Sequence, residues 1–311
     1  MLPLVFFRKP GVFLSTARSG TPGSVLRLWR MYDITKKNGP YPKWKGGYAM
    51  KYGMIGCGNM GGAIARGLSQ STKNILVSDR SGKGRTLAAE MGIVYGQNQI
   101  IAESCDVIFL GVKPHMMKDM LLPLQPVLQE RKPLLISMAA GITLQTVESL
   151  AGAQLPVIRI MPNTPTAIGK GVIPYCCNAR VTEEMLTPWL ADMQPCGLLD
   201  RVEEGWMDGI SALSGSGPAY LYVLLEALAD GAVACGIPRA KALDYAAMTM
   251  VGAAEMYLQT HIHPGALKDA VCSPGGSTIQ GIRVLEQQGF RGAAVDCVIA
   301  AYEKNKELAK Q

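Results

Sequence analysis

Six residues between a short apolar run and a helical stretch have the spacing of a phosphate-binding loop. Gly56-Cys57-Gly58-Asn59-Met60-Gly61 follows a short apolar run and precedes a stretch with helical periodicity. In such a G-x-G-x-x-G loop the first glycine allows a tight turn and the second lets the backbone approach a pyrophosphate. The third permits close packing of helix on strand, and the free N–H groups of the helix face the anion. We therefore expect a dinucleotide cofactor here; the alternative is a glycine-rich turn without a ligand.

The end of the second expected strand bears on the choice between NAD and NADP. Ser78 closes the apolar run, and Asp79 stands where a carboxylate would bind the ribose 2′-hydroxyl of NAD. Cations and a hydroxyl suited to a 2′-phosphate follow at once, namely Arg80, Ser81, Lys83 and Arg85. These signals conflict. Four donors beside one acid favour NADPH, with NAD as the alternative and a solvated turn as the structural explanation.

Three more segments end apolar strands, at the edge where open α/β sheets bind ligands. They are Val112-Lys113-Pro114, Ala139-Ala140-Gly141 and the turn around Asn163. Pro162 and Pro165 restrict the backbone on both sides of Asn163. The Asn163 amide could therefore point at a nicotinamide or a substrate, although a rigid strand-end turn explains the pattern equally well.

Two segments rich in Gly and Ser interrupt the helical second half of the chain. Residues 214–220 read SGSGPAY and residues 273–278 read SPGGST, and each leads into a helix. Low helix propensity at these positions indicates loops. Hydroxyls and unpaired N–H groups at a helix N-terminus suit a carboxylate, although N-capping by Ser and Thr is the simpler explanation for either segment. Because there are two of them, we expect an anion site.

The elements around these segments predict two domains. Apolar runs at 52–55, 74–78, 107–112, 134–138 and 157–161 alternate with helical stretches, which is typical of a parallel sheet buried on both faces. After about Glu204 only helices are expected, at 218–235, 241–260, 264–271, 277–288 and 290–310. The fold class is thus α/β: a doubly wound, Rossmann-type dinucleotide-binding domain over 50–204 and an all-α domain over 205–311.

The helix that begins near Tyr220 is apolar nearly all round, with Leu221, Val223, Leu224, Leu225, Leu228 and Val233. A helix without a polar face must be covered by other helices. A domain of this size supplies few of them, so we expect a partner subunit and a homodimer.

Composition excludes several classes of protein. The chain is 48% hydrophobic and 18% charged, as expected of an ordered globular protein. Residues 1–49 carry a net charge of +8, and the rest carries −1, so nucleic acid is not expected as a partner. No apolar stretch is long enough to predict a membrane span. The eight cysteines and three histidines are scattered, which argues against a metal site and a disulfide scaffold.

The basic residues 1–49 form an extension with two interpretations. They are rich in Arg and Ser, as transit peptides are, but several Pro and Gly residues would interrupt an amphipathic helix. We prefer an upstream or disordered extension, with Met50 as the start of the folded protein. We expect a cytoplasmic location, and an organellar one only if residues 1–49 act as a transit peptide.

Three motifs together resemble one family. The segment 267–286, LKDAVCSPGGSTIQGIRVLE, is similar to the signature of the pyrroline-5-carboxylate reductases. The segments 160–165 (IMPNTP) and 212–220 (ALSGSGPAY) are similar to two other hallmarks of that family, and the resemblance runs from Met50 to the C-terminus. His261 stands where some relatives carry an acid.

This resemblance implies reduction of 1-pyrroline-5-carboxylate to L-proline, the last step of proline biosynthesis, by NADPH or NADH. It implies that Thr278 hydrogen-bonds the imine nitrogen as the catalytic residue. The substrate carboxylate would be held by Ser273, Gly275, Gly276 and Ser277. The site would lie between the dinucleotide domain and the helices of an intertwined homodimer, from which larger assemblies can be built.

Direct hydride transfer to an imine needs no strong general base, which fits the absence of a His–Asp or Lys pairing in the expected site. Two rival functions remain at this point. A hydroxyacid-type dehydrogenase would need a Lys or His for the alcohol proton, and the helical domain shows no such candidate beside a glycine-rich loop. A non-catalytic regulator that binds NAD(P) or pyridoxal phosphate is the other. Assays with the cyclic imine and with an α-keto acid separate the three.

Overall fold

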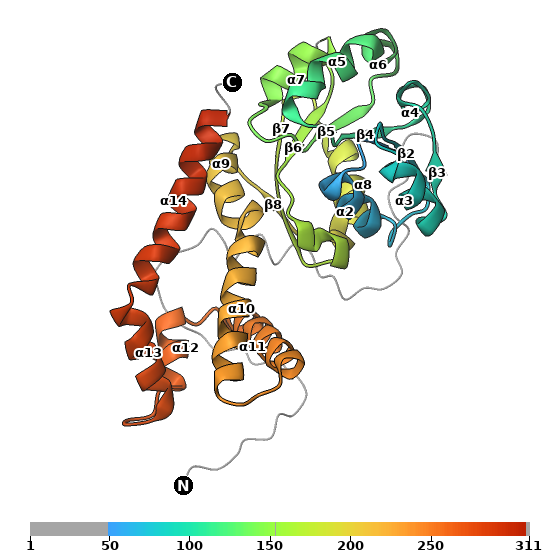
Figure 1. Cartoon of the computed structure of the whole chain (residues 1–311). Coiled ribbons are helices and arrows are strands. Elements are labelled where there is room, and N and C mark those ends of the chain that lie inside the picture. Colours follow the sequence, from blue (N-terminus) through green and yellow to red (C-terminus); the bar gives the residue numbers. More distant parts are fainter. Residues whose placement is uncertain (1–48, 153, 309–311) are drawn as a thin grey trace, which may run out of the picture. The chain divides into compact units, whose positions relative to one another are not determined.

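The computed structural model of the protein describes residues 49–152 and 154–308. The basic extension considered above lies outside the described residues, apart from its last one. In the described part of the chain, strands form a single eight-stranded sheet of order β3-β2-β1-β4-β5-β6-β7-β8, followed by helices (Figure 1). The strands are β1 (Tyr52–Ile55), β2 (Ile75–Ser78), β3 (Val94–Tyr95), β4 (Val107–Leu110), β5 (Leu134–Ser137), β6 (Val157–Ile160), β7 (Gly171–Cys177) and β8 (Gly197–Arg201).

The first six strands are parallel, and β7 runs antiparallel to β6. The five predicted strands are thus confirmed as β1, β2, β4, β5 and β6, each four residues long and fully buried. Burial on both faces explains why their sequences are continuous apolar runs rather than alternating ones.

Helices cover both faces of this sheet, as the doubly wound fold requires. The side chains of strand β1 alternate between two hydrophobic cores, one on each face of the sheet. Tyr52 and Met54 belong to the core that includes residues of α2, α3 and α8, whereas Ile55 belongs to the core that includes residues of α4 to α7. The helices are α2 (Asn59–Leu68), α3 (Lys83–Met91), α4 (Asn98–Ser104), α5 (Met117–Leu121), α6 (Gln125–Arg131), α7 (Leu144–Ala151) and α8 (Glu183–Met193).

After the 3₁₀ turn η5 (Glu204–Trp206), the described chain is helical. The elements are α9 (Met207–Ile210), the π-helical turn η6 (Ser211–Gly215), α10 (Gly217–Ala234), α11 (Arg239–Thr260), α12 (Pro264–Ala270), α13 (Ser277–Gln287) and α14 (Phe290–Leu308). The five predicted helices are confirmed, and each observed end lies within two residues of the predicted one. The loop expected directly before the helix at 218–235 is wrong in part, because Ser214 and Gly215 belong to η6 and α10 begins at Gly217.

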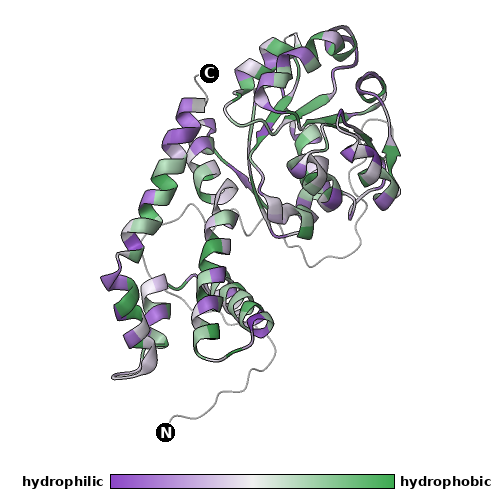
Figure 2. Ribbon diagram, viewed as in Figure 1, coloured by the Kyte–Doolittle hydropathy of each residue, from purple (hydrophilic) through white to green (hydrophobic). Residues whose placement is uncertain are grey.

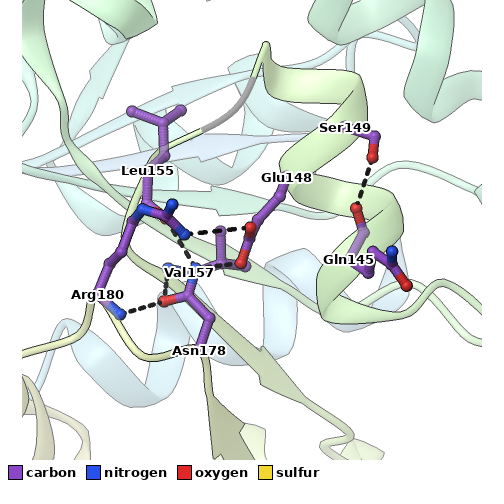
Figure 3. Close-up of polar contacts among 7 residues, drawn as sticks. All are labelled: Gln145, Glu148, Ser149, Leu155, Val157, Asn178 and Arg180. Carbon is purple, nitrogen blue, oxygen red and sulfur yellow. Dashed lines mark hydrogen bonds and ion pairs between the residues drawn. The ribbon is translucent and has the colours of Figure 1, made fainter.

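Asn178, which directly follows β7, links the end of this strand to the start of β6 and to α7 (Figure 3). The Asn178 side-chain oxygen accepts from the N–H of Val157 at 3.1 Å, and its Nδ2 donates to the Leu155 carbonyl at 2.8 Å and to Glu148 of α7. Glu148 also pairs with Arg180 at 3.3 Å. These bonds satisfy backbone groups where the antiparallel strand joins the sheet.

Large apolar side chains stay exposed on the helices of the second half, where Figure 2 shows apolar stretches on α10, α11 and α14. Val223 on α10 and Met248 on α11 are each 70% exposed, and Val295 on α14 is 57% exposed. An apolar surface of this kind marks a contact with another molecule.

Among the described residues, no helix combines the length and the apolar character that a membrane crossing requires.

Candidate active site

The glycine loop has the geometry that its sequence predicts. Gly56 has φ of +99°, and a Cβ there would lie 2.7 Å from the Gly111 carbonyl group. A Cβ on Gly61 would lie 2.1 Å from the Gly56 carbonyl oxygen, whereas a Cβ on Gly58 would meet no atom within 4 Å. Gly56 and Gly61 are therefore required by the turn and its packing. Gly58 instead borders open space at the N-terminus of α2.

That open space belongs to a cavity of about 460 Å³. It joins three segments that are distant in sequence, each at the carboxyl end of a strand. Its lining residues are Gly58, Asn59, Met60, Lys83, Gly111, Val112, Lys113, Pro114, Met138, Ala139 and Ala140. The predicted segments after β1, β4 and β5 are thus brought together, and Gly141 follows them directly with φ of +72°.

These residues fit a nicotinamide dinucleotide. Gly58 leaves the backbone bare where a pyrophosphate would approach, and the first turn of α2 offers N–H groups without intrahelical partners. A side chain at position 58 would occupy the space that the ligand needs. The fit rests on this cradle and on the cavity beside it.

The Asp79 carboxylate accepts its hydrogen bonds from its own loop and from the start of α3. Its carboxylate accepts from the N–H of Ser81 at 3.2 Å, from the Ser81 hydroxyl at 2.8 Å and from the N–H of Gly84 at 3.0 Å. Partial burial acts to raise the pKa of Asp79, but the hydrogen bonds from Gly84, Ser81 and Lys83 outweigh it, so the pKa lies below its usual value. The carboxylate stabilises the start of α3.

The cations that follow Asp79 differ in their freedom. Arg85 stacks on the Tyr95 ring with 5.1 Å to its centroid. Arg80 is exposed and has no hydrogen-bond or ion-pair partner in the part of the chain that the structure describes. Lys83 lines the cavity. Ser78 is buried, and its hydroxyl donates to the Asn98 side chain at 2.6 Å, which joins the end of β2 to the start of α4.

A second cavity, of about 480 Å³, shares Gly58, Asn59 and Lys83 with the first and extends between α2 and α3. The ion pair of Arg66 with Glu90, at 2.6 Å, lies in its wall. Cys57 also lines it, but burial, with a smaller effect of Asp79, raises the pKa of this thiol to about 12. Cys57 is therefore a neutral thiol that donates to the Ser78 carbonyl at 3.6 Å.

Asn163 lies on the turn after β6 and is only 6% exposed. Its Oδ1 accepts from the N–H of Val172 at 2.9 Å, and its Nδ2 donates to the Ser214 carbonyl at 3.0 Å. The amide thus bridges β7 and the π-helical turn η6. Of the two explanations left open by the sequence, this geometry favours the structural one.

The segment Ser273 to Thr278 precedes and opens α13. The N–H of Gly276 donates to the Ser273 carbonyl at 3.0 Å, Gly275 has φ of +72°, and the side chains of Ser277 and Thr278 are exposed in the first helical turn. The N–H groups of Ser277 and Thr278, in the first turn of α13, have no intrahelical partner and lie beside exposed hydroxyls, as a carboxylate site needs. The residues lining the two cavities, by contrast, all lie between Cys57 and Ala167.

Sequence reasoning missed Gly111 as a lining residue. A Cβ on Gly111 would lie 2.4 Å from the Gly56 carbonyl oxygen, so this glycine allows the two strand ends to approach. The available signal was its position, because Gly111 directly precedes the predicted segment Val112 to Pro114.

Comparison with known proteins gives this geometry a family. Residues 204–308 match the family described as pyrroline-5-carboxylate reductase dimerisation, and residues 51–141 match the one described as NADP oxidoreductase, coenzyme F420-dependent. The pyrroline-5-carboxylate reductase of Pisum sativum is 41% identical over 262 residues, covering 83% of this chain and 95% of that protein. That of Escherichia coli (strain K12) is 39% identical over 266 residues, covering 84% and 98%.

The chain belongs to the pyrroline-5-carboxylate reductase family. Two solved structures of this family agree. The enzyme of Coxiella burnetii is 34% identical with a TM-score of 0.76, covering 85% of this chain and 100% of that one. The enzyme of Plasmodium falciparum, solved with NADP bound, is 32% identical with a TM-score of 0.76, covering 84% and 98%.

Membership of the pyrroline-5-carboxylate reductase family makes the chain an oxidoreductase with a nicotinamide cofactor. The Rossmann-type sheet followed by a helical region is confirmed as the fold class. The boundary between the two domains at 204/205 stays a prediction.

Proposed function

We propose that this protein reduces the ring C=N of 1-pyrroline-5-carboxylate to give L-proline, with NADPH as the preferred cofactor. The observation that carries the proposal is the presence in one chain of two complementary surfaces. One is the cavity at Gly58, which fits a dinucleotide; the other is the segment Ser273 to Thr278, which suits a small carboxylated substrate.

In this mechanism the protein contributes position and electrostatics. The N–H group of Ser277 and the Ser273 hydroxyl bind the substrate carboxylate at the N-terminus of α13. Gly275 and Gly276 shape the turn, because the N–H of Gly276 donates to the Ser273 carbonyl. The Thr278 hydroxyl orients the imine through its nitrogen and stabilises the charge that develops there. When bound, the reduced nicotinamide supplies the hydride to the imine carbon.

A homodimer would complete the site. The apolar faces of α10, α11 and α14 are exposed, and the chain matches the family's dimerisation region over 204–308. Because the cavity residues and the Ser273–Thr278 segment come from separate parts of the chain, we propose that the segment of one subunit closes the cavity of its partner.

The preference for NADPH rests on the loop after β2. Asp79 accepts three hydrogen bonds within its own loop, so it is a poor partner for a ribose 2′-hydroxyl. Arg80 is exposed and unpaired among the described residues, and Lys83 lines the cavity. Two free cations suit a 2′-phosphate.

The decisive assay follows oxidation of NADPH and NADH with 1-pyrroline-5-carboxylate, with an α-keto acid and without substrate. The proposal predicts turnover of the cyclic imine, with a higher kcat/KM for NADPH, and formation of L-proline in equal amount. Turnover of the keto acid in place of the imine would indicate a hydroxyacid-type dehydrogenase. Binding of the nucleotide without any turnover would indicate a non-catalytic protein.

We also propose that the enzyme works in the cytoplasm. The observation behind this is that the excess of basic charge is confined to residues 1–49, while the rest of the chain carries −1. Fluorescent fusions with and without residues 1–49 should show the same diffuse distribution. Organellar import that depends on residues 1–49 would contradict this.

A further inference from the structure

The carbonyl of Ser214 lacks the partner that a helix would normally supply. In η6 the N–H of Ser216 donates to the Ser211 carbonyl at 3.0 Å, which is the five-residue spacing of a π-helix. In an α-helix the Ser214 carbonyl would accept from residue 218, but Pro218 has no N–H. The N–H of Ala219 donates to the Ser216 carbonyl at 3.0 Å. The Ser214 carbonyl therefore takes its donor from outside the helix.

Asn163 supplies this donor. Its Nδ2 lies 3.0 Å from the Ser214 carbonyl oxygen, and its Oδ1 is fixed by the N–H of Val172 at 2.9 Å. The side chain is almost fully buried, so the two bonds form in a medium of low dielectric constant, where they set the orientation of the amide strongly. The turn after β6 is thereby fastened to the start of α10.

A second, charged fastening lies in the same place. Arg159 of β6 has a side chain that is only 4% exposed and lies 3.1 Å from Glu204 and 3.6 Å from Asp208. Glu204 also accepts from the N–H of Leu144 at 2.8 Å, at the start of α7. Elements at the carboxyl side of the sheet and the first helical turns after it are thus joined by partly buried polar bonds.

We infer that Asn163 is a positioning residue: by capping the Ser214 carbonyl it holds the helical region in register with the cavity at Gly58. The inference rests on the function proposed above, because it concerns the distance between the hydride donor and the imine. A misplacement of about 1 Å costs roughly 100-fold in rate when two reactants must be aligned.

The test is a double-mutant cycle of Asn163→Ala and Pro218→Ala on the full-length enzyme. In the wild-type background, Asn163→Ala should lower kcat by roughly 10- to 100-fold. Its dissociation constant for NADPH, measured by fluorescence titration, should stay within about twofold, because the cavity at Gly58 is intact. Pro218→Ala provides an N–H for the Ser214 carbonyl but no bond to the turn after β6, so in that background the same Asn163→Ala change should still lower kcat by roughly 10- to 100-fold.

Asn178→Ala is the matched control, since Asn178 is another asparagine that bridges backbone groups (Figure 3), and it lines neither cavity. It should lower Tm while kcat stays within about twofold of wild type. If Asn163→Ala does not fold, Asn163→Ser, which is too short to reach Ser214, replaces it in the cycle.

Three results would overturn the inference. One is an unchanged kcat in Asn163→Ala, and another is a loss of less than about threefold in the Pro218→Ala background, which would show that the unpaired Ser214 carbonyl, and not lost register, slows the enzyme. The third is an NADPH dissociation constant that rises in parallel with the loss of kcat, which would make Asn163 a cofactor contact. A failure of the proposed function itself is distinguishable, because the wild-type enzyme would then not reduce the imine at all. Hydrogen exchange at residues 211–220 would still report the loss of the bond from Asn163 to Ser214 in Asn163→Ala.

Discussion

At the scale of single residues, Thr278 and Asp79 show two different uses of a helix N-terminus. Thr278 is exposed in the first turn of α13, with its hydroxyl free for a ligand. Asp79 turns its carboxylate to the first turn of α3 and is occupied there. The two predictions below follow from this contrast.

Thr278→Ala should reduce kcat by roughly 100-fold, the usual effect of removing one donor that stabilises developing charge. The dissociation constant for NADPH should not change, since the cavity residues lie between Cys57 and Ala167. Steady-state kinetics with the cyclic imine and a binding titration measure the two. Thr278→Ser should retain most activity, and an unchanged kcat in Thr278→Ala would remove the proposed role.

Asp79→Asn should destabilise the protein in a pH-dependent manner. The folded-state pKa of Asp79 is lowered, so the ionised group stabilises the fold at pH above the usual value of 3.8, and this contribution is lost as the pH falls through the folded pKa. The difference in Tm between wild type and variant should be full at neutral pH and shrink below pH 3.8. A difference that grows on acidification would contradict the account.

At the scale of elements, two glycines of the loop have different roles: Gly61 allows close packing, and Gly58 leaves space for the ligand. Gly61→Ala places a Cβ 2.1 Å from the Gly56 carbonyl oxygen and should cost about 1–3 kcal/mol of stability through overpacking. Gly58→Ala meets no atom within 4 Å, so it should leave Tm unchanged and weaken NADPH binding. Thermal unfolding with a binding titration tests the pair. Equal losses of stability would show that Gly58 is structural too.

The sequence predicted these elements unevenly, for physical reasons. Strands buried on both faces are continuous apolar runs, so β1, β2, β4, β5 and β6 were predictable. Strand β7 was missed because Gly171 and Pro174 weaken the strand pattern, and β8 because its exposed positions include Asp200 and Arg201.

The site was predictable where local chemistry determines it. The glycine loop and the strand-end segments Val112–Pro114 and Ala139–Ala140 meet at one cavity, because the carboxyl ends of parallel strands share an edge. The capping of α3 by Asp79 and the bond from Asn163 to Ser214 were not predictable. Both depend on side-chain orientation and on contacts between distant segments.

At the scale of the whole molecule, the exposed apolar helices predict an obligatory partner. Met248→Glu, at a position that is 70% exposed on α11, should dissociate the homodimer and abolish activity. Analytical ultracentrifugation should show the mass halved. Leu198→Glu on the edge strand β8, where the side chain is 49% exposed, is the control and should leave the dimer intact. An active monomer would contradict the shared site.

The most direct test of the composite site is complementation between two inactive variants. Gly58→Asp should block the cavity without disturbing the fold, and Thr278→Ala should disable the substrate segment. If the cavity of one subunit is completed by the Ser273–Thr278 segment of its partner, a mixed dimer has one intact site. Equal mixing after dissociation should then restore about a quarter of the wild-type imine reduction. Mixed dimers that stay inactive, with both variants folded, would contradict the account.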